Sequence, residues 1–274
     1  MRLAVPSGQR DRQPNRHDVQ VGGLSAADLI LLALGALLIG FAKTSIGGVA
    51  SISVALFAAV LPARESTGAL LPLLIAGDLF ALQAYRAHAE WARLLRLFPS
   101  VALGVVAGAV FVSFVDDIVM RRTIGAVLLG LVLLTLWRRR TGRPDEAAAD
   151  GTTDAAGRTW PAALGYGSLA GFTTMVANAA GAVMSLYLLS ARLDKLAFLG
   201  TAAWFFFLVN LFKVPFSIGL GLLTVDSLKL NAALVPAVLV GALVGRVVIR
   251  RVNQELFERL VLVFTAVSSV NLLL

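Results

Sequence analysis

The 274-residue chain has no cysteine, and charged residues make up only 15% of it. The absence of cysteine excludes disulfides, thiolate metal sites and a cysteine nucleophile. The two histidines, His17 and His88, both lie in polar or charged segments, so an intramembrane histidine cluster is excluded as well. The sequence also lacks a Walker loop, a dinucleotide fingerprint and a His-Glu-x-x-His helix, which argues against ATPase and protease activity. We therefore expect a protein that is not an enzyme and that needs no metal and no cofactor.

Hydrophobic residues are abundant, at 58% of the chain. A soluble domain would carry about 25% charged residues. Several apolar runs approach the length that crosses a bilayer, about 20 residues. The sequence therefore predicts an all-α polytopic membrane protein. We do not attribute the net charge of +8 to nucleic-acid binding, because arginines at span ends usually reflect orientation and contact with anionic membrane lipids.

Polar stretches divide the chain into four parts. Residues 1–23 are expected to form a disordered cytoplasmic arm and residues 24–140 a first transmembrane repeat. Residues 141–159 are expected to form a linker and residues 160–274 a second transmembrane repeat. The expected apolar segments are Leu24–Ala42, Val49–Val60, Ala69–Tyr85, Leu97–Val115 and Ile118–Trp137, then Trp160–Ala177, Val183–Ala191, Phe198–Phe216, Leu230–Val248 and Leu256–Leu274. Ser25 and Asp28 are placed to form a capping box at the start of the first segment.

Matching residues recur in the two halves at a nearly constant spacing. The spacing is 131 for Gly40/Gly171, 132 for Gly68/Gly200 and Asp78/Asn210, and 137 for Gly104/Gly241 and Gly108/Gly245. The last two pairs form small-xxx-small motifs, which allow helices to pack closely. Single glycines could coincide by chance, but an ordered series argues against that. We predict two homologous halves with about four to five transmembrane segments each.

The topology has two solutions. The arginine-rich arm, the 86–96 segment and the 138–143 run should all be cytoplasmic by the positive-inside rule. That requires an even number of crossings in the first half, although it has five apolar segments. One segment could be re-entrant, which gives four crossings per half, or five crossings per half could make the repeats inverted. We favour eight full spans with broken or re-entrant helices at the glycine-rich motifs.

The first glycine-rich break carries a lysine and two hydroxyl groups within a long apolar run. A lysine at this depth costs several kcal/mol in hydrocarbon unless it has a partner or a wet cavity. An opened helix presents free N–H groups that favour anions. We predict that this break binds a small oxyanion through Lys43, Thr44, Ser45, Gly47 and Gly48. The alternative is that Lys43 extends from a helix end to the lipid headgroups.

The second break corresponds to the first but has no charge. It offers the hydroxyl groups of Thr173 and Thr174 and the amide of Asn178, which both donates and accepts hydrogen bonds. We predict that these side chains and Asn210 complete the anion site. The alternative for Asn178 is a hydrogen bond that only holds two helices together.

Asp78 and Lys213 are the other charges deep in apolar segments. Asp78 aligns with Asn210, and Lys213 follows Asn210 by three residues on the same helix face. We favour a structural ion pair between Asp78 and Lys213, and the alternative is that Asp78 carries a proton for coupling. The aromatic run 204–207 is expected to face lipid or to pack against other helices.

The paired Gly-Phe motifs, the glycine-rich breaks and the Gly-x-x-x-Gly helices resemble the sulfite exporter TauE/SafE family of membrane permeases. The likeness is strongest over Gly40–Gly48, Leu61–Gly68 and Gly77-Asp78. The resemblance implies a secondary transporter that exports a small sulfur-containing anion, such as sulfite or an organosulfonate, across the bacterial inner membrane. A proton, a counter-ion and a second copy of the chain are the further partners to be considered.

Two other functions remain open at this stage. A passive anion channel would show flux that never saturates, and a non-transporting membrane assembly factor would have a dry centre with every charge held by fixed protein partners.

Overall fold

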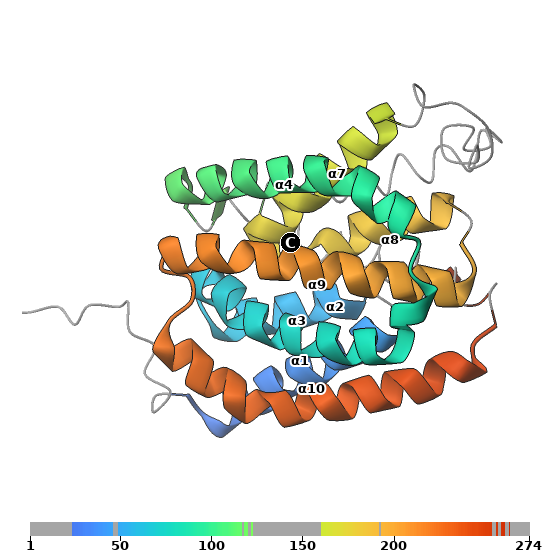
Figure 1. Cartoon of the computed structure of the whole chain (residues 1–274). Coiled ribbons are helices and arrows are strands. Elements are labelled where there is room, and N and C mark those ends of the chain that lie inside the picture. The colour runs from blue at the N-terminus through green and yellow to red at the C-terminus, as the bar shows by residue number, and fades with distance from the viewer. Residues whose placement is uncertain are drawn as a thin grey trace, which may run out of the picture.

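In the computed structural model (Figure 1), the described residues are 24–45, 49–116, 118–119, 122, 160–191, 193–253, 256, 259–260 and 263. The regular elements are the helices α1 (Ala26–Thr44), α2 (Ala50–Val60), α3 (Ala63–Tyr85), η3 (Arg86–His88), α4 (Trp91–Phe114), α7 (Trp160–Ala177), α8 (Ala180–Ser190), α9 (Lys195–Gly219) and α10 (Val225–Arg251). The all-helical class is thus confirmed. The arm, the linker and most of the two predicted segments Ile118–Trp137 and Leu256–Leu274 lie outside the described residues.

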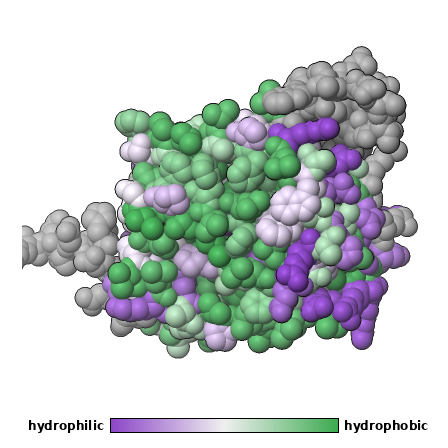
Figure 2. Space-filling model, in the orientation of Figure 1, coloured by the Kyte–Doolittle hydropathy of each residue, from purple (hydrophilic) through white to green (hydrophobic). Residues whose placement is uncertain are grey.

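Five of the described helices are long and apolar enough to cross a membrane. They are Ala26–Thr44, Glu65–His88, Trp91–Phe114, Lys195–Gly219 and Val225–Arg251. Figure 2 shows a broad hydrophobic surface with hydrophilic residues gathered towards the ends of the bundle. A protein with this pattern is a multi-pass membrane protein.

Polar residues cap or extend the starts of several of these helices, and α3 and α10 begin earlier than the apolar pattern predicts. The predicted capping box of α1 is confirmed, because Ser25 Oγ accepts from the Asp28 N–H and Asp28 Oδ2 accepts from the Ser25 N–H. A second capping box joins Thr224 and Ser227 at the start of α10, five residues before the expected Leu230. The polar stretch before Ala69, which precedes the expected apolar segment, forms the first turns of α3.

Helices α1 and α10 pack with their backbones in close contact. A Cβ atom added at Gly40 would lie 1.9 Å from the Val238 carbonyl oxygen, and one added at Gly241 would lie 1.9 Å from that of Leu37. Gly245, further along α10, faces Phe41 and Thr44. Since residue numbers rise together along this contact, the two helices run in the same direction.

Helices α4 and α7 repeat this contact in the same direction. An added Cβ would lie 2.1 Å from the Val101 carbonyl oxygen at Gly171, and 2.1 Å from that of Ser168 at Gly104. Gly171 and Ser168 follow Gly40 and Leu37 of the α1–α10 contact by 131 positions. Val101 and Gly104 precede Val238 and Gly241 of that contact by 137 positions. Helix α1 thus packs against α10 in the same way as α4 packs against α7.

Helices α3 and α9 form the centre of the bundle and run in opposite directions (Figure 1). Gly68, near the start of α3, lies against Leu222, which follows α9. Gly200, near the start of α9, lies against Tyr85 and His88 at the end of α3. The predicted repeat pairs α3 with α9, and these two helices are antiparallel.

The ends of the bundle differ in charge. One end, which we call the basic end, carries Arg86, His88, Arg93, Arg96, Arg246 and Arg250 at the end of α3, the start of α4 and the end of α10. Because α1 runs parallel to α10, it begins at the opposite end, where Asp28, Asp226 and Lys229 lie. We expected the start of α1 and the 86–96 segment to lie on the same side of the membrane, with an even number of crossings between them. They lie at opposite ends of the bundle, so this expectation is wrong.

The close helix contacts predict a clear effect of glycine substitution. We expect Gly40→Ala and Gly171→Ala each to lower the free energy of unfolding by about 1–3 kcal/mol, because backbone atoms occupy the space of the new methyl group. Gly165→Ala in α7 is the matched control, because nothing lies within 4 Å of its added Cβ. It should stabilise the helix by about 0.5–1 kcal/mol. Thermal and denaturant unfolding in detergent micelles would measure all three, and equal effects would contradict the packing.

Candidate functional site

The chain leaves helical geometry between α1 and α2. The Tyr85 hydroxyl donates to the Thr44 carbonyl oxygen at 2.8 Å, and the Ser45 hydroxyl donates to that of Phe41 at 2.6 Å. These bonds satisfy carbonyl groups at the end of α1 that the helix itself leaves free. Helix α2 then starts at Ala50, and its N-cap residue Val49 forms no side-chain cap. The predicted ligands Gly47 and Gly48 lie outside the described residues.

The second break, between α7 and α8, turns on Asn178. Its φ of 55° is left-handed, a conformation that asparagine adopts more readily than most residues. The Asn178 N–H donates to the Thr174 carbonyl oxygen, which is the bond of an αL C-cap motif, and the Ala179 N–H donates to the Thr173 carbonyl oxygen. Helix α8 also begins without a side-chain cap, so its first N–H groups keep their capacity to donate.

A buried ion pair links α1 to α3. Lys43 Nζ lies 2.6 Å from Asp78 Oδ1, and Asn210 of α9 donates to Asp78 Oδ2 at 2.7 Å. Oδ1 accepts no well-aligned hydrogen bond, so the ammonium group holds it by charge. The same ammonium group lies 4.1 Å from the ring centre of Phe206, a cation–π contact. Asp78 is fully buried and Lys43 nearly so.

Lys213 is buried among neutral partners. Its ammonium group donates to Asn178 Oδ1 and, at 3.3 Å, to Thr174 Oγ1. Asn178 in turn donates through Nδ2 to the Thr67 carbonyl oxygen at 2.9 Å. Lys213 thus connects α9 to the second break, and Asn178 connects the break to the start of α3.

Lys213, the predicted partner of Asp78 in an ion pair, is not the residue that pairs with it. Lys43 binds the carboxylate instead, because α1 and α3 run parallel and bring the first break against the middle of α3. Within the described part of the chain, this cluster has two lysines and one carboxyl group. With all three groups ionised, it carries one positive charge that no described carboxylate neutralises.

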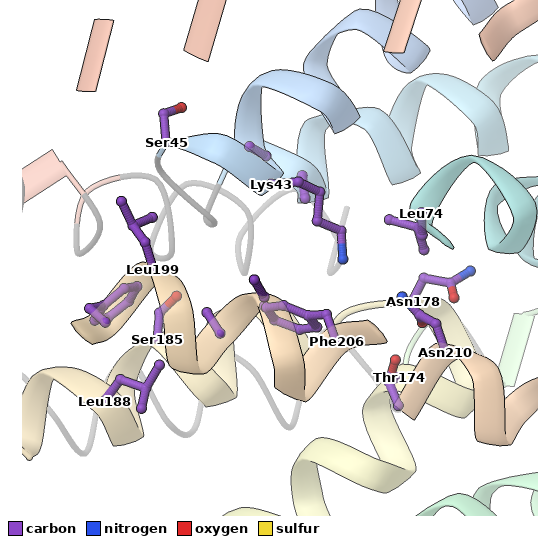
Figure 3. Close-up of a pocket in the computed structure, with 16 residues that line it drawn as sticks. Lys43, Ser45, Leu74, Thr174, Asn178, Ser185, Leu188, Leu199, Phe206 and Asn210 are labelled. Atoms are coloured by element: carbon purple, nitrogen blue, oxygen red, sulfur yellow. The ribbon is translucent and has the colours of Figure 1, made fainter. Parts of the chain in front are cut away.

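A cavity of about 640 Å³, a volume that includes its opening, lies between the two breaks (Figure 3). Figure 3 shows Lys43 pointing towards Phe206, with Thr174, Asn178 and Asn210 on one side and Leu188 and Leu199 on the other. The apolar side follows α8 and the first turns of α9 towards the basic end. The residues that line the whole cavity are Ala42, Lys43, Ser45, Ala50, Leu74, Thr174, Asn178, Gly181, Ser185, Leu188, Phe198, Leu199, Ala202, Ala203, Phe206 and Asn210.

The structure brings five of the predicted ligands to this cavity, namely Lys43, Ser45, Thr174, Asn178 and Asn210. Thr44 does not line it, because its hydroxyl group donates to the Ala242 carbonyl oxygen of α10 at 2.8 Å. The Thr173 hydroxyl donates to Leu169 in its own helix. These two hydroxyl groups serve helix packing and backbone bonding.

Sequence reasoning missed Phe206 and Ser185 as cavity residues. The aromatic run 204–207 was expected to face lipid or pack, and Phe205 does pack in the core, at 0% exposure. Phe206 is one position further round the helix and faces Lys43. The spacing of 132 pairs Ser185 with Ser53, but that pairing does not mark Ser185 as a cavity residue.

The family model described as "Sulfite exporter TauE/SafE" matches residues 32–272. The chain belongs to the TauE/SafE family. This is a family of membrane transporters rather than enzymes, and its description names sulfite export. Among curated proteins and among solved structures, none gives a significant match. The TauE/SafE assignment thus depends on the family model, which covers both breaks and the whole cavity.

The buried pair predicts a strong asymmetry between single and double substitutions. We expect Asp78→Ala to lower the free energy of unfolding by about 3–5 kcal/mol, because it leaves two buried ammonium groups without a carboxylate. The double variant Lys43→Met with Asp78→Leu should recover most of that loss. Asp226→Ala is the matched control, because its pair with Lys229 is 53% and 68% exposed and should contribute less than about 1 kcal/mol. Equal losses in all three would contradict a buried pair.

Proposed function

We propose that the protein is a secondary transporter that exports small sulfur-containing anions, such as sulfite or organosulfonates, across the bacterial inner membrane. The observation that carries this proposal is the excess of positive charge beside the cavity. The cluster there has two buried lysines and one carboxyl group, which pairs with Lys43, and a bound anion would supply the missing negative charge.

The surroundings of these lysines support an anion as the ligand. The uncapped starts of α2 and α8 lie at the two breaks, and Ala50 and Gly181 in their first turns line the cavity. The start of a helix favours negative charge. The amides of Asn178 and Asn210 add hydrogen-bonding groups that can select an oxyanion.

The direction of the helices supports two inverted repeats. The α1–α10 and α4–α7 contacts correspond residue by residue, while the corresponding helices α3 and α9 are antiparallel. This fits five crossings per half better than the four that we favoured from the sequence. Helices α2 and α8 have 11 residues each, so each covers about 16 Å, half of the hydrocarbon thickness. We propose that α2 and α8, together with the breaks before them, carry the chain back across the bilayer in opposite directions as one of the five crossings of each half.

Export follows from charge and orientation. The positive-inside rule assigns the basic end to the cytoplasm, and the cavity extends towards that end along α8 and α9. An inside-negative potential favours anion efflux by about 2.3 kcal/mol per charge per 100 mV. The apolar side chains of Leu188, Phe198 and Leu199 favour an anion with a small hydrocarbon part.

Removing either lysine should impair transport. We expect Lys43→Gln and Lys213→Gln each to reduce the flux of labelled sulfoacetate at subsaturating concentration by about tenfold or more, because a hydrogen bond to a charged group is lost. The matched control is Lys229→Gln, which removes an exposed lysine at the opposite end of the bundle and should leave flux unchanged. Counterflow in proteoliposomes gives the measurement.

The same proteoliposomes test the function itself. Saturable counterflow of labelled sulfite, sulfate or sulfoacetate, altered by an imposed potential, is expected of a transporter. Flux that rises linearly with concentration and shows no counterflow would identify a channel instead. No flux of any of the three anions, in protein shown to be folded, would overturn the proposed function. Repeating the assay with a pH gradient identifies proton coupling.

A further inference from the structure

The cavity is walled by the second half on the side that leads to the basic end. The side chains concerned belong to α8 and the first turns of α9: Ser185, Phe198, Leu199, Ala202 and Ala203. The spacing of 132 that relates Gly68 to Gly200 and Asp78 to Asn210 relates these residues to α2 and the first turns of α3. Their counterparts, which we call the α2–α3 wall, are Ser53, Ser66, Thr67, Leu70 and Leu71.

The α2–α3 wall lies on the other side of the cavity, towards the end of the bundle opposite the arginines. Leu74, one turn after Leu70, still lines the cavity. Beyond it the wall is closed, and its five side chains are 0–7% exposed. Leu70 packs with Leu230 and Leu234 of α10 in a dry hydrophobic cluster.

Two polar side chains on this closed side lack partners. Ser53 Oγ and both polar atoms of Asn231 are buried and have no hydrogen-bond partner among the described residues. A serine in a membrane helix commonly donates to a carbonyl group one turn earlier, as Ser45 does with Phe41. Ser53 has no such bond. An unpaired buried polar group is costly, so a conformation that brings water to Ser53 and Asn231 would relieve that cost.

A hydrogen-bonded chain connects the α2–α3 wall to the lysine cluster. Asn178 accepts from Lys213 and donates to the carbonyl oxygen of Thr67, which belongs to the wall. An anion that draws the Lys213 ammonium group away from Asn178 would weaken this connection. One side chain, Asn178, therefore contacts both the cavity and the α2–α3 wall.

We propose that Ser53, Ser66, Thr67, Leu70 and Leu71 line a second access path, closed in this structure, which opens the cavity to the end of the bundle opposite the arginines. The second access path rests on the proposed function and adds to it the route by which the anion leaves. In the second state the α2–α3 wall separates and the α8–α9 wall closes, because the two walls are built from corresponding residues. The bond from Asn178 to Thr67 keeps the second path closed until an anion binds.

The lack of cysteine allows a direct test in the full chain. Single cysteines are placed on the α2–α3 wall (Ser53→Cys, Leu70→Cys) and on the α8–α9 wall (Ser185→Cys, Ala202→Cys). A membrane-impermeant methanethiosulfonate reagent is added to either side of oriented vesicles. Arg250→Cys and Lys229→Cys report the two ends of the bundle, and Leu103→Cys, 66% exposed on α4, reports a lipid-facing position. Sulfoacetate is the ligand, because sulfite itself reacts with the reagent.

We expect Ser185→Cys and Ala202→Cys to react only from the side that labels Arg250→Cys. Ser53→Cys and Leu70→Cys should react only from the side that labels Lys229→Cys, and sulfoacetate should accelerate them. Adding Asn178→Asp, which keeps an acceptor for Lys213 but cannot donate to Thr67, should raise the rate at Ser53→Cys by about fivefold, as expected for the loss of one hydrogen bond.

Three outcomes would overturn the second path. The first is no reaction at Ser53→Cys or Leu70→Cys from either side in variants that retain saturable flux, which leaves the transporter function standing. The second is reaction of both walls from both sides, which indicates a continuous channel. The third is an unchanged rate at Ser53→Cys when Asn178→Asp is added. Alternating reaction of the two walls without any flux would instead support the path and overturn the proposed function.

Discussion

The low dielectric constant of the membrane interior is the constraint that organises the centre of this protein. Three ionisable side chains, Lys43, Asp78 and Lys213, lie within apolar spans, and none can remain there without partners. The fold answers by bringing α1, α3, α9 and both helix breaks to one place. The carboxylate goes to Lys43, and Lys213 takes an amide and a hydroxyl oxygen. What is left over is positive charge beside a cavity, which is the feature that the proposed transport of anions uses.

Most of the described helices, and five of the residues that line the cavity, could be predicted from the sequence. Long apolar runs and polar caps identify most of the described helices, and a deep lysine next to a glycine-rich break indicates a site. The partner of Asp78 could not be predicted, because it depends on whether α1 and α9 approach α3 from the same or the opposite direction. Spacing along one helix, such as that of Lys213 from Asn210, carries no information about helix direction.

The sequence did not show which hydroxyl groups line the cavity. Thr44 and Thr173 sit beside cavity residues in sequence, yet each donates to a backbone carbonyl group. On a helix, neighbouring positions are about 100° apart, so adjacent residues rarely face the same space. The same geometry explains why Phe206 reaches the cavity while Phe205 belongs to the core. Motif membership therefore predicted the location of the site better than it predicted which members touch it.

The exchange of helices between the two halves bears on how the chain is made. Helix α1 leaves the ribosome early, but its close partner α10 is synthesised about 200 residues later. Until then the grooves around Gly40 have no occupant other than lipid, and the lysine near the end of α1 waits for α3. Contacts so distant in sequence are slow to form. During synthesis the first part of the chain is therefore in an incomplete, charge-bearing state, and such states are prone to misassembly until their last partners are made.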